Sequence, residues 1–272
     1  MPPPKNRPEA RNPEPSEDTR DERVFQSRKE RLYAGALLRE RLPHGQHAQW
    51  KPVRKQRDAI ELLEESNRYR LPNLVPVRYG RMLRSPFTFL RGSAGLMAHD
   101  LAATPTTGIQ VQACGDCHLM NFGLFATPER NLIFDINDFD ETLPAPWEWD
   151  VKRLAISFAV AARDNDLGDK EARAIAAGCV GAYRENLRRF SKMNPLDVWY
   201  DRLDAQTIID MAPNAQIKKI REQVVAKARM RVGDYLYPKI SGEVGGRRRL
   251  IDQPPILFHV NEKGFRRNVH LA

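Results

Sequence analysis

The sequence predicts an α+β fold that is mostly helical, and two observations support this prediction. Apolar residues recur at helical spacing before residue 70 and again after residue 150. Between these regions, short apolar runs with strand character flank turns that carry many polar side chains. We therefore expect a unit of short strands, placed between two helical regions, that presents the polar residues.

The chain has 272 residues, of which 41% are apolar and 29% charged, as in an ordinary soluble globular protein. No run approaches the ~20 uncharged apolar residues of a transmembrane helix, so we expect no membrane span. The N-terminal residues lack the layout of a secretory signal. Three cysteines, an odd number, do not suggest a disulfide framework, and a cytoplasmic setting is favoured.

The N-terminal third is expected to contain a tail, helices and one strand. Residues 1–28 are rich in Pro, Arg and Glu, which predicts a disordered charged tail, and residues 29–70 show helical periodicity. Leu71–Gly80 contains two prolines and is therefore not expected to be helical. Arg84–Arg91 alternates aromatic and polar residues like a strand, and Gly92–Leu101 has the pattern of a turn that opens a helix.

The central segment is expected to consist of short strands. Ile109–Ala113 alternates apolar and polar residues and predicts one strand. Phe122–Phe125 and Asn131–Ile136 are expected to form a hairpin around the turn Thr127–Arg130. Leu143–Trp147 is rich in proline and is predicted to be a loop.

Three helices are expected after the loop. Asp150 stands where a helix N-cap belongs, before an apolar stripe that runs to Ala162. A second helix is predicted over 169–192 and a third, strongly basic one over 215–232. The expected organisation is 1–28 (disordered tail), 29–257 (one domain) and 258–272 (irregular tail), and the domain divides into 29–70 (helical), 71–141 (strands, loops and the site) and 150–235 (helical).

Seven polar side chains fall within 26 residues of the central segment: Asp116, His118, Asn121, Asp135, Asp138, Asp140 and Glu141. Carboxylates and a carboxamide on short turns are the ligands that a hard cation such as Mg²⁺ prefers. Phosphoryl transfer needs the same groups, namely one carboxylate to accept a hydroxyl proton and Asn and Asp side chains to hold the metal. The cluster therefore predicts a metal-dependent site.

Three motifs and two flanking segments resemble one bacterial family. They are Gly-Asp-x-His-x-x-Asn-Phe-Gly at 115–123, Phe-Asp-Ile-Asn-Asp-Phe-Asp-Glu at 134–141, Trp-Glu-Trp-Asp-x-x-Arg-Leu at 147–154, and a flanking pair at 85–92 and 252–256. From about Arg28 to Leu257 the chain resembles the family called domain of unknown function 2252. More distantly, the central part is similar to the catalytic lobe of the protein-kinase-like fold, in particular the aminoglycoside and choline phosphotransferase branch.

The resemblance implies a role for each matching residue. Asp116 and Asn121 keep the five-residue step of the phosphotransferase catalytic loop, which implies that Asp116 is the catalytic base and Asn121 a metal ligand. Asp135 and Asp138 compete for the second metal position, and Asp138 is favoured because Asp150 follows it by 12 residues, close to the spacing of that branch. Asp135 is then expected to support the strand end or a second metal. The implied cofactors are Mg²⁺ or Mn²⁺ and ATP.

The chain also departs from the resembled proteins. Cys114 stands where the phosphotransferases usually carry His. No Gly-rich loop and no Lys-bearing strand precedes Asp116, and members of the resembled family carry both after the Pro-Pro motif. The resemblance therefore implies a C-terminally truncated member that keeps the catalytic-loop half and lacks the nucleotide-binding half.

Three functions remain open from the sequence. The first is a Mg²⁺-dependent kinase-like phosphotransferase, whose partner is a small molecule or protein with an acceptor hydroxyl. The second is a catalytically inactive binding or regulatory module, which the missing nucleotide-binding half favours. The third is a metal-dependent hydrolase that uses the same acidic cluster.

Several residues near the cluster have two interpretations. Arg91 either binds a phosphate of the cofactor or pairs with a motif aspartate. His118 is expected to orient other groups rather than to bind metal. Cys114 and Cys117 form a Cys-x-x-Cys that could suggest zinc or redox chemistry, but no second cysteine pair supports this reading. Arg153 is expected to form a buried structural ion pair.

The C-terminal segment is strongly basic. Residues 211–272 carry 13 Lys and Arg residues against five acidic ones. This surplus suggests either a solvated surface or a face for an acidic partner, and no motif in it favours nucleic acid. Gly242–Gly246 resembles a phosphate loop, but without a flanking strand and helix it is interpreted as a flexible turn.

Overall fold

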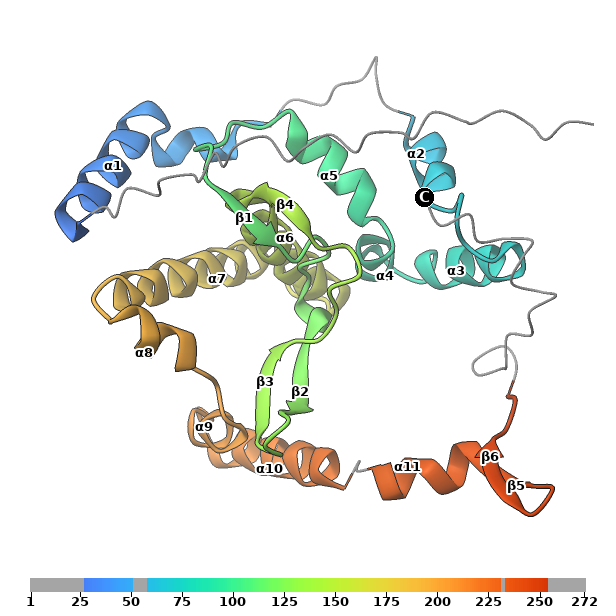
Figure 1. Ribbon diagram of the computed structural model, residues 1–272. Coiled ribbons are helices and arrows are strands. Elements are labelled where there is room, and N and C mark those ends of the chain that lie inside the picture. The colour runs from blue at the N-terminus through green and yellow to red at the C-terminus, as the bar shows by residue number, and fades with distance from the viewer. Residues whose placement is uncertain (1–26, 51–57, 231–232, 254–272) are drawn as a thin grey trace, which may run out of the picture.

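The computed structural model describes residues 27–50, 58–230 and 233–253. The two predicted tails lie outside these residues, except for Ser27 and Arg28. Within the described part the fold is α+β and mostly helical, with small antiparallel sheets, as predicted (Figure 1). No described helix is long and apolar enough to cross a membrane.

The N-terminal half is built from short helices. They are α1 (Arg28–Arg41), α2 (Ala59–Glu65), α3 (Val75–Met82), α4 (Pro86–Arg91) and α5 (Ala94–Ala102), with 3₁₀ turns at His44–Ala48 and Pro72–Leu74. Helices α3 and α4 pack together, and α4 packs against the long helix α6 (Trp147–Asp164). In Figure 1, α4 lies between α6 and α3.

Two small sheets occupy the centre of the chain. Strand β1 (Gln110–Ala113) pairs antiparallel with β4 (Leu143–Pro146), and β2 (Phe122–Ala126) forms a hairpin with β3 (Leu132–Ile136). The 3₁₀ turn Leu119–Asn121 leads directly into β2. The polar motifs therefore lie where the two sheets meet, and α6 packs beneath β1 and this turn.

The C-terminal part is again mostly helical. Its elements are α7 (Asp169–Phe190), α8 (Pro195–Tyr200), α9 (Ala205–Asp210), α10 (Ala215–Arg229), α11 (Gly233–Ile240) and the hairpin of β5 (Ser241–Val244) and β6 (Arg247–Leu250). Helix α7 packs along α6, and the β2–β3 hairpin reaches α9 and α10 (Figure 1). There, a buried cluster of Ala205, Ile209 and Val225 contacts Leu124 and Leu132.

Several predicted elements are confirmed. The helical region after residue 29, the turn and helix at 92–101, the first strand, the central hairpin, and the helices near 169–192 and 215–232 all form. The turn predicted over Gly242–Gly246 is confirmed only at Gly245 and Gly246, which both adopt positive φ, because Gly242–Val244 belong to strand β5. Periodic patterns over long or isolated segments thus predicted the elements well.

Two predictions in the N-terminal half were wrong for the same reason. Leu71–Gly80 contributes to a 3₁₀ turn and to α3, and Arg84–Arg91 forms α4 rather than a strand. Pro72, Pro76 and Pro86 all lie in the first turn of their helices, where a backbone N–H has no intrahelical partner, so proline costs nothing there.

Two predictions near α6 were also wrong. The Pro-rich segment predicted as a loop forms β4, in which Pro144 and Pro146 lie opposite Gln112 and Gln110. Its only described partner is β1, and proline is tolerated in such an edge strand. Asp150 is not an N-cap, because α6 begins at Trp147 and Asp150 lies within its first turn. Its carboxylate binds the motif loop instead.

Candidate functional site

The first polar motif is a loop, residues 114–121, that is fastened to α6. The Asp150 carboxylate accepts hydrogen bonds from the backbone N–H groups of Cys114 (2.7 Å) and Gly115 (3.1 Å). Farther along the helix, the buried Ser157 hydroxyl accepts one from the N–H of Leu119 at 2.9 Å. Side chains of α6 thus supply partners that the irregular backbone of the loop could not find in itself.

Asp116 projects from this loop onto Arg153 of α6. Its Oδ1 accepts from Arg153 Nε at 2.7 Å and from the Nη2 of the same side chain. Arg153 is almost fully buried and also donates to the Leu90 carbonyl at the end of α4, at 2.7 Å. The predicted buried ion pair of Arg153 is therefore present, and its partner is the residue expected to be the catalytic base.

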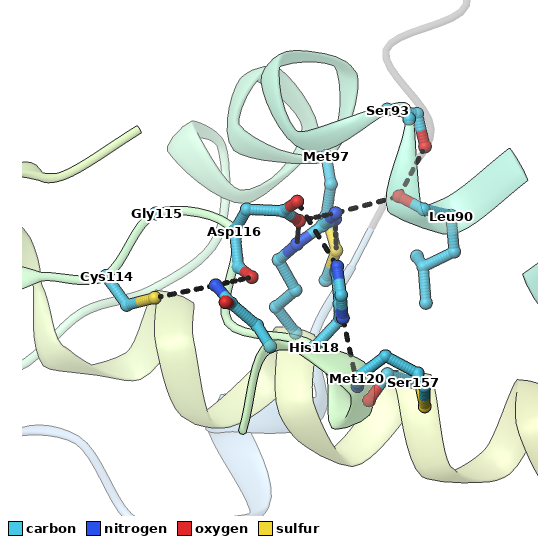
Figure 2. A network of polar contacts seen from close by, with 12 residues as sticks. Leu90, Ser93, Met97, Cys114, Gly115, Asp116, His118, Met120 and Ser157 are labelled. Atoms are coloured by element: carbon cyan, nitrogen blue, oxygen red, sulfur yellow. Dashed lines mark hydrogen bonds and ion pairs between the residues drawn. The ribbon is translucent and has the colours of Figure 1, made fainter. Parts of the chain in front are cut away.

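His118 occupies the other side of the Asp116 carboxylate. Its Nε2 lies 3.4 Å from Asp116 Oδ2, and its Nδ1 accepts from the backbone N–H of Met120 at 3.1 Å (Figure 2). Burial alone would raise the pKa of Asp116, but His118 and Arg153 outweigh it and hold the pKa below its ordinary value. His118 therefore orients Asp116, and both of its ring nitrogens are already engaged.

Asn121 joins the loop to the second polar motif. Its side-chain Nδ2 donates to the backbone carbonyls of Asp116 and Asp138, each at 3.1 Å. The backbone carbonyl of Asn121 accepts from the backbone N–H of Asn137 at 2.9 Å. The side chain is buried, and within the described chain no hydrogen bond reaches its Oδ1. The carboxamide oxygen is therefore the atom that remains for a ligand.

The second motif forms an exposed acidic turn, residues 137–141, after β3. Asp138 Oδ1 accepts only from the N–H of Asp140 in its own turn, at 3.1 Å. Burial raises the pKa of Glu141, and the nearby carboxylates of Asp116, Asp138 and Asp140 raise it further. The acidic turn thus gathers negative charge beside the motif loop.

Both motifs line one large cavity of about 1460 Å³. Its lining includes Asp116, His118, Asn121, Asp138, Asp140 and Glu141, and it continues along α2 to α5. Arg91, at the end of α4, also lines the cavity and forms no ion pair with a described aspartate. Asp135 does not belong to the lining, and its Oδ1 accepts from the adjacent N–H of Ile136 at 2.8 Å. The structure therefore brings together all the predicted site residues except Asp135.

A comparison with protein-family models agrees with the family that the motifs resemble. The family described as "uncharacterized protein conserved in bacteria (DUF2252)" matches residues 70–272. The chain belongs to this family. Neither the curated proteins nor the solved structures contain a significant match to it. The DUF2252 match begins later and ends later than the span of about 28–257 inferred from the motifs.

The cysteines of this DUF2252 protein are structural in character. Cys114 and Cys117 are both buried. Burial, together with the negative charges of Asp150 and Asp116, raises the pKa of Cys114 to about 11. Burial is also the main reason that the pKa of Cys117 lies well above its ordinary value. Thiols with raised pKa values stay protonated at neutral pH and are poor nucleophiles and metal ligands.

The oxygen atoms of the DUF2252 site are of the type that binds a hard cation, but they do not form a complete coordination sphere among the described residues. Asn121 Oδ1 and the Asp138 carboxylate are oxygens of the type that Mg²⁺ and Mn²⁺ prefer. Among the described residues, no three His, Cys, Asp or Glu side chains converge as metal ligands. A cation at this position would therefore be held by few protein atoms, as is usual for Mg²⁺ bound together with phosphates.

Two features of the site were missed in the sequence. The first is the pairing of Arg153 with Asp116 across 37 residues, for which the sequence contains no local signal. The second is a set of arginines from α3, α4 and their flanking turns that lines the same cavity as the carboxylates. The frequency of arginine between residues 68 and 91 was a signal that could have pointed to it.

Proposed function

We propose that the cavity binds ATP together with Mg²⁺ or Mn²⁺ and that the protein is a phosphotransferase acting on a hydroxyl acceptor. One observation supports this most directly: Asp116, Asn121 and Asp138 line the same cavity, and Arg91 lines it as well. A proton-accepting carboxylate, oxygen ligands for a cation and a cationic group for phosphate are the parts that phosphoryl transfer needs.

Asn121 and Asp138 would hold the cation in this proposal. The Asn121 Oδ1 is fixed in place because its Nδ2 is anchored to two backbone carbonyls. The cation would neutralise negative charge on the phosphate oxygens. Asp135 receives no ligand role, because its carboxylate lies outside the cavity lining and caps its own backbone.

Asp116 would accept the proton of the acceptor hydroxyl. Its lowered pKa keeps it ionised at neutral pH and also makes it a weak base. Weak basicity is compatible with this chemistry, because phosphoryl transfer depends mainly on positioning and charge stabilisation. Arg153 and His118 fix the carboxylate from two sides and would supply that positioning.

A binding or regulatory module is the second candidate, and one observation favours it. Both oxygens of Asp116 already face a protein partner, so the carboxylate is engaged by the protein without any acceptor. A domain with this arrangement would bind the nucleotide without turning it over. Both candidates share the cavity and the cation ligands, and they differ only in what Asp116 does.

Calorimetric titration of the full chain with ATP, with and without Mg²⁺, tests the shared part. We expect Mg²⁺-dependent binding that Asp138→Asn removes, whereas Asp135→Asn, a matched control near the end of β3, leaves it unchanged. Arg91→Gln should weaken ATP binding by about tenfold, the effect of one charge-assisted contact. No heat and no shift in melting temperature at millimolar ATP would refute nucleotide binding.

Phosphate transfer separates the two candidates. With γ-labelled ATP and Mg²⁺, the phosphotransferase proposal predicts slow release or transfer of label that Asp138→Asn abolishes. Binding of ATP without any turnover above the Asp138→Asn background would instead support the binding module.

A further inference from the structure

The two sides of the cavity carry opposite charges. The side formed by residues 62–96 contributes five arginines, Arg70, Arg78, Arg81, Arg84 and Arg91, and no carboxylate. The side formed by residues 116–141 contributes four carboxylates and no lysine or arginine. We call the first side the arginine wall, defined by these five arginines.

The arginine wall forms no direct ion pair with the acidic side among the described residues, although the Glu141 carboxylate interacts electrostatically with Arg70 and Arg78 at longer range. In the described chain, no ion pair of 4.0 Å or less joins any of the five guanidinium groups to a carboxylate. The cavity of about 1460 Å³ lies between the two sides. Five like charges that face an open space attract an anion strongly, because cavity walls of low dielectric concentrate the field.

Arg78 shows that part of the wall is held in place. Its Nη1 donates to Asn67 Oδ1 at 2.7 Å and its Nη2 to the Gly92 carbonyl at 2.5 Å. Burial lowers the pKa of Arg78 and the positive charge of Arg70 lowers it further, whereas Tyr79 and Glu141 raise it and offset part of the change. The net lowering shows that the two nearby cations are only partly compensated by the protein, so a bound anion would stabilise them.

The wall is larger than one phosphate requires. Arg78 and Arg81 lie one turn apart on α3, Arg84 follows that helix and Arg70 precedes it. One guanidinium can bind a phosphate in a bidentate manner, so Arg91 alone suffices for the contact assigned to it above. Four cations remain without a role in binding the nucleotide.

We propose that Arg70, Arg78, Arg81 and Arg84 form a second anion subsite, which holds an acceptor that itself carries one or more phosphate groups. The identity of this ligand as the acceptor rests on the proposed phosphotransferase function, whereas the anion subsite does not. The volume supports two ligands, since about 1460 Å³ exceeds the roughly 300–1,000 Å³ of a typical single-ligand pocket.

Inorganic tripolyphosphate, titrated calorimetrically into the full chain with a chelator present, probes the subsite without any metal. The double variant Arg81→Gln/Arg84→Gln removes two exposed members of the wall and leaves the hydrogen bonds of Arg78 intact. The matched control is Arg39→Gln/Arg68→Gln, which removes the same charge from exposed positions outside the cavity lining. We expect the first to weaken binding by about tenfold or more and the control by less than about twofold.

Three outcomes would overturn the proposed subsite or its phosphorylated ligand. Equal weakening by both double variants would show a general charge effect. Equal or greater weakening by Arg91→Gln than by Arg81→Gln/Arg84→Gln would place the probe at the nucleotide position. Tighter binding of a short polyglutamate peptide than of tripolyphosphate would reject a phosphorylated ligand in favour of an acidic peptide.

Titration with ATP and Mg²⁺, compared with tripolyphosphate, separates the anion subsite from the proposed phosphotransferase function. If ATP with Mg²⁺ does not bind but tripolyphosphate still requires Arg81 and Arg84, the phosphotransferase proposal fails and the anion subsite stands. If ATP with Mg²⁺ binds, the second subsite predicts that tripolyphosphate binds to the saturated protein as well. Full competition between the two would show one shared site and overturn it.

Discussion

The motif loop at 114–121 and the acidic turn at 137–141 have similar polar compositions and opposite surroundings. In the loop, Asp116, His118 and Asn121 each have defined partners, and His118 and Asn121 are buried. In the turn, Asp138 and Asp140 are exposed. The difference is one of anchoring: the side chains of the loop are held by protein partners, whereas Asp138 and Asp140 of the turn are exposed to solvent.

The two regions are joined through backbone atoms rather than through carboxylates. Asn121 Nδ2 holds the Asp138 carbonyl at 3.1 Å, and the Cys114 thiol lies 3.6 Å from the same oxygen. Gly115, at φ +83°, passes so close to the Glu141 carbonyl that a Cβ there would overlap it. The turn is therefore fixed in position through its backbone, while its carboxylates form no ion pair within the described part of the chain.

Arg153→Met should have the largest effect on stability. It leaves the partly buried Asp116 carboxylate without its charged partner, and breaking a buried pair by removing one member costs about 3–5 kcal/mol. Urea unfolding at neutral pH measures the loss. The control is Arg163→Met, which breaks the exposed Arg163–Asp169 pair and should barely change the melting temperature. Similar losses in both variants would show that the loop is not anchored as described.

Gly115→Ala should rank second. The substitution combines a left-handed backbone with an overlap against the Glu141 carbonyl, and we expect a loss of about 2–3 kcal/mol in the free energy of unfolding. Gly108→Ala separates the two causes, because Gly108 has φ +84° but its Cβ would meet only Arg41 Nη2, at 3.7 Å. Its loss should therefore be smaller, about 1 kcal/mol. Equal losses would mean that the contact between loop and turn contributes nothing.

The contacts of the motif loop show which parts of the site could be predicted from the sequence. The loop and the turn were recognised as polar motifs between strands, because their pattern is local. The partners of Asp116 and of the Cys114 and Gly115 backbone come from Arg153 and Asp150, more than 30 residues away. Such contacts depend on how α6 packs under the loop, which no local pattern encodes.

The same limit explains the errors in the fold. Proline content excluded a helix at Leu71–Gly80, and aromatic alternation favoured a strand at Arg84–Arg91, because neither pattern states where a helix begins. At Arg84–Arg91, a capping box formed by Ser85 and Thr88 starts helix α4, and Pro86 is compatible with the first turn of that helix. The arginine wall went unseen because these two misread segments carry most of it.

Acid should weaken the anchoring of the loop in a predictable direction. The folded-state pKa of Asp116 lies below its ordinary value, so its contribution to stability is present above about pH 4 and is lost as the pH falls through the folded-state pKa. Urea unfolding of the wild type and of Asp116→Asn between pH 7 and pH 3 measures this. The difference in unfolding free energy between them should shrink below about pH 4. A difference independent of pH would contradict the charged pair.

Asp138→Asn should have the smallest effect on stability, within about 0.5 kcal/mol, because the side chain is exposed and binds only the N–H of Asp140. An asparagine oxygen can accept the same bond, and the Asp138 carbonyl that Asn121 holds is unchanged. Unfolding of this variant beside Arg153→Met tests the comparison between loop and turn directly. A loss approaching that of Arg153→Met would show that the Asp138 carboxylate supports the fold, and it could then no longer be the group that the turn keeps available for a cation.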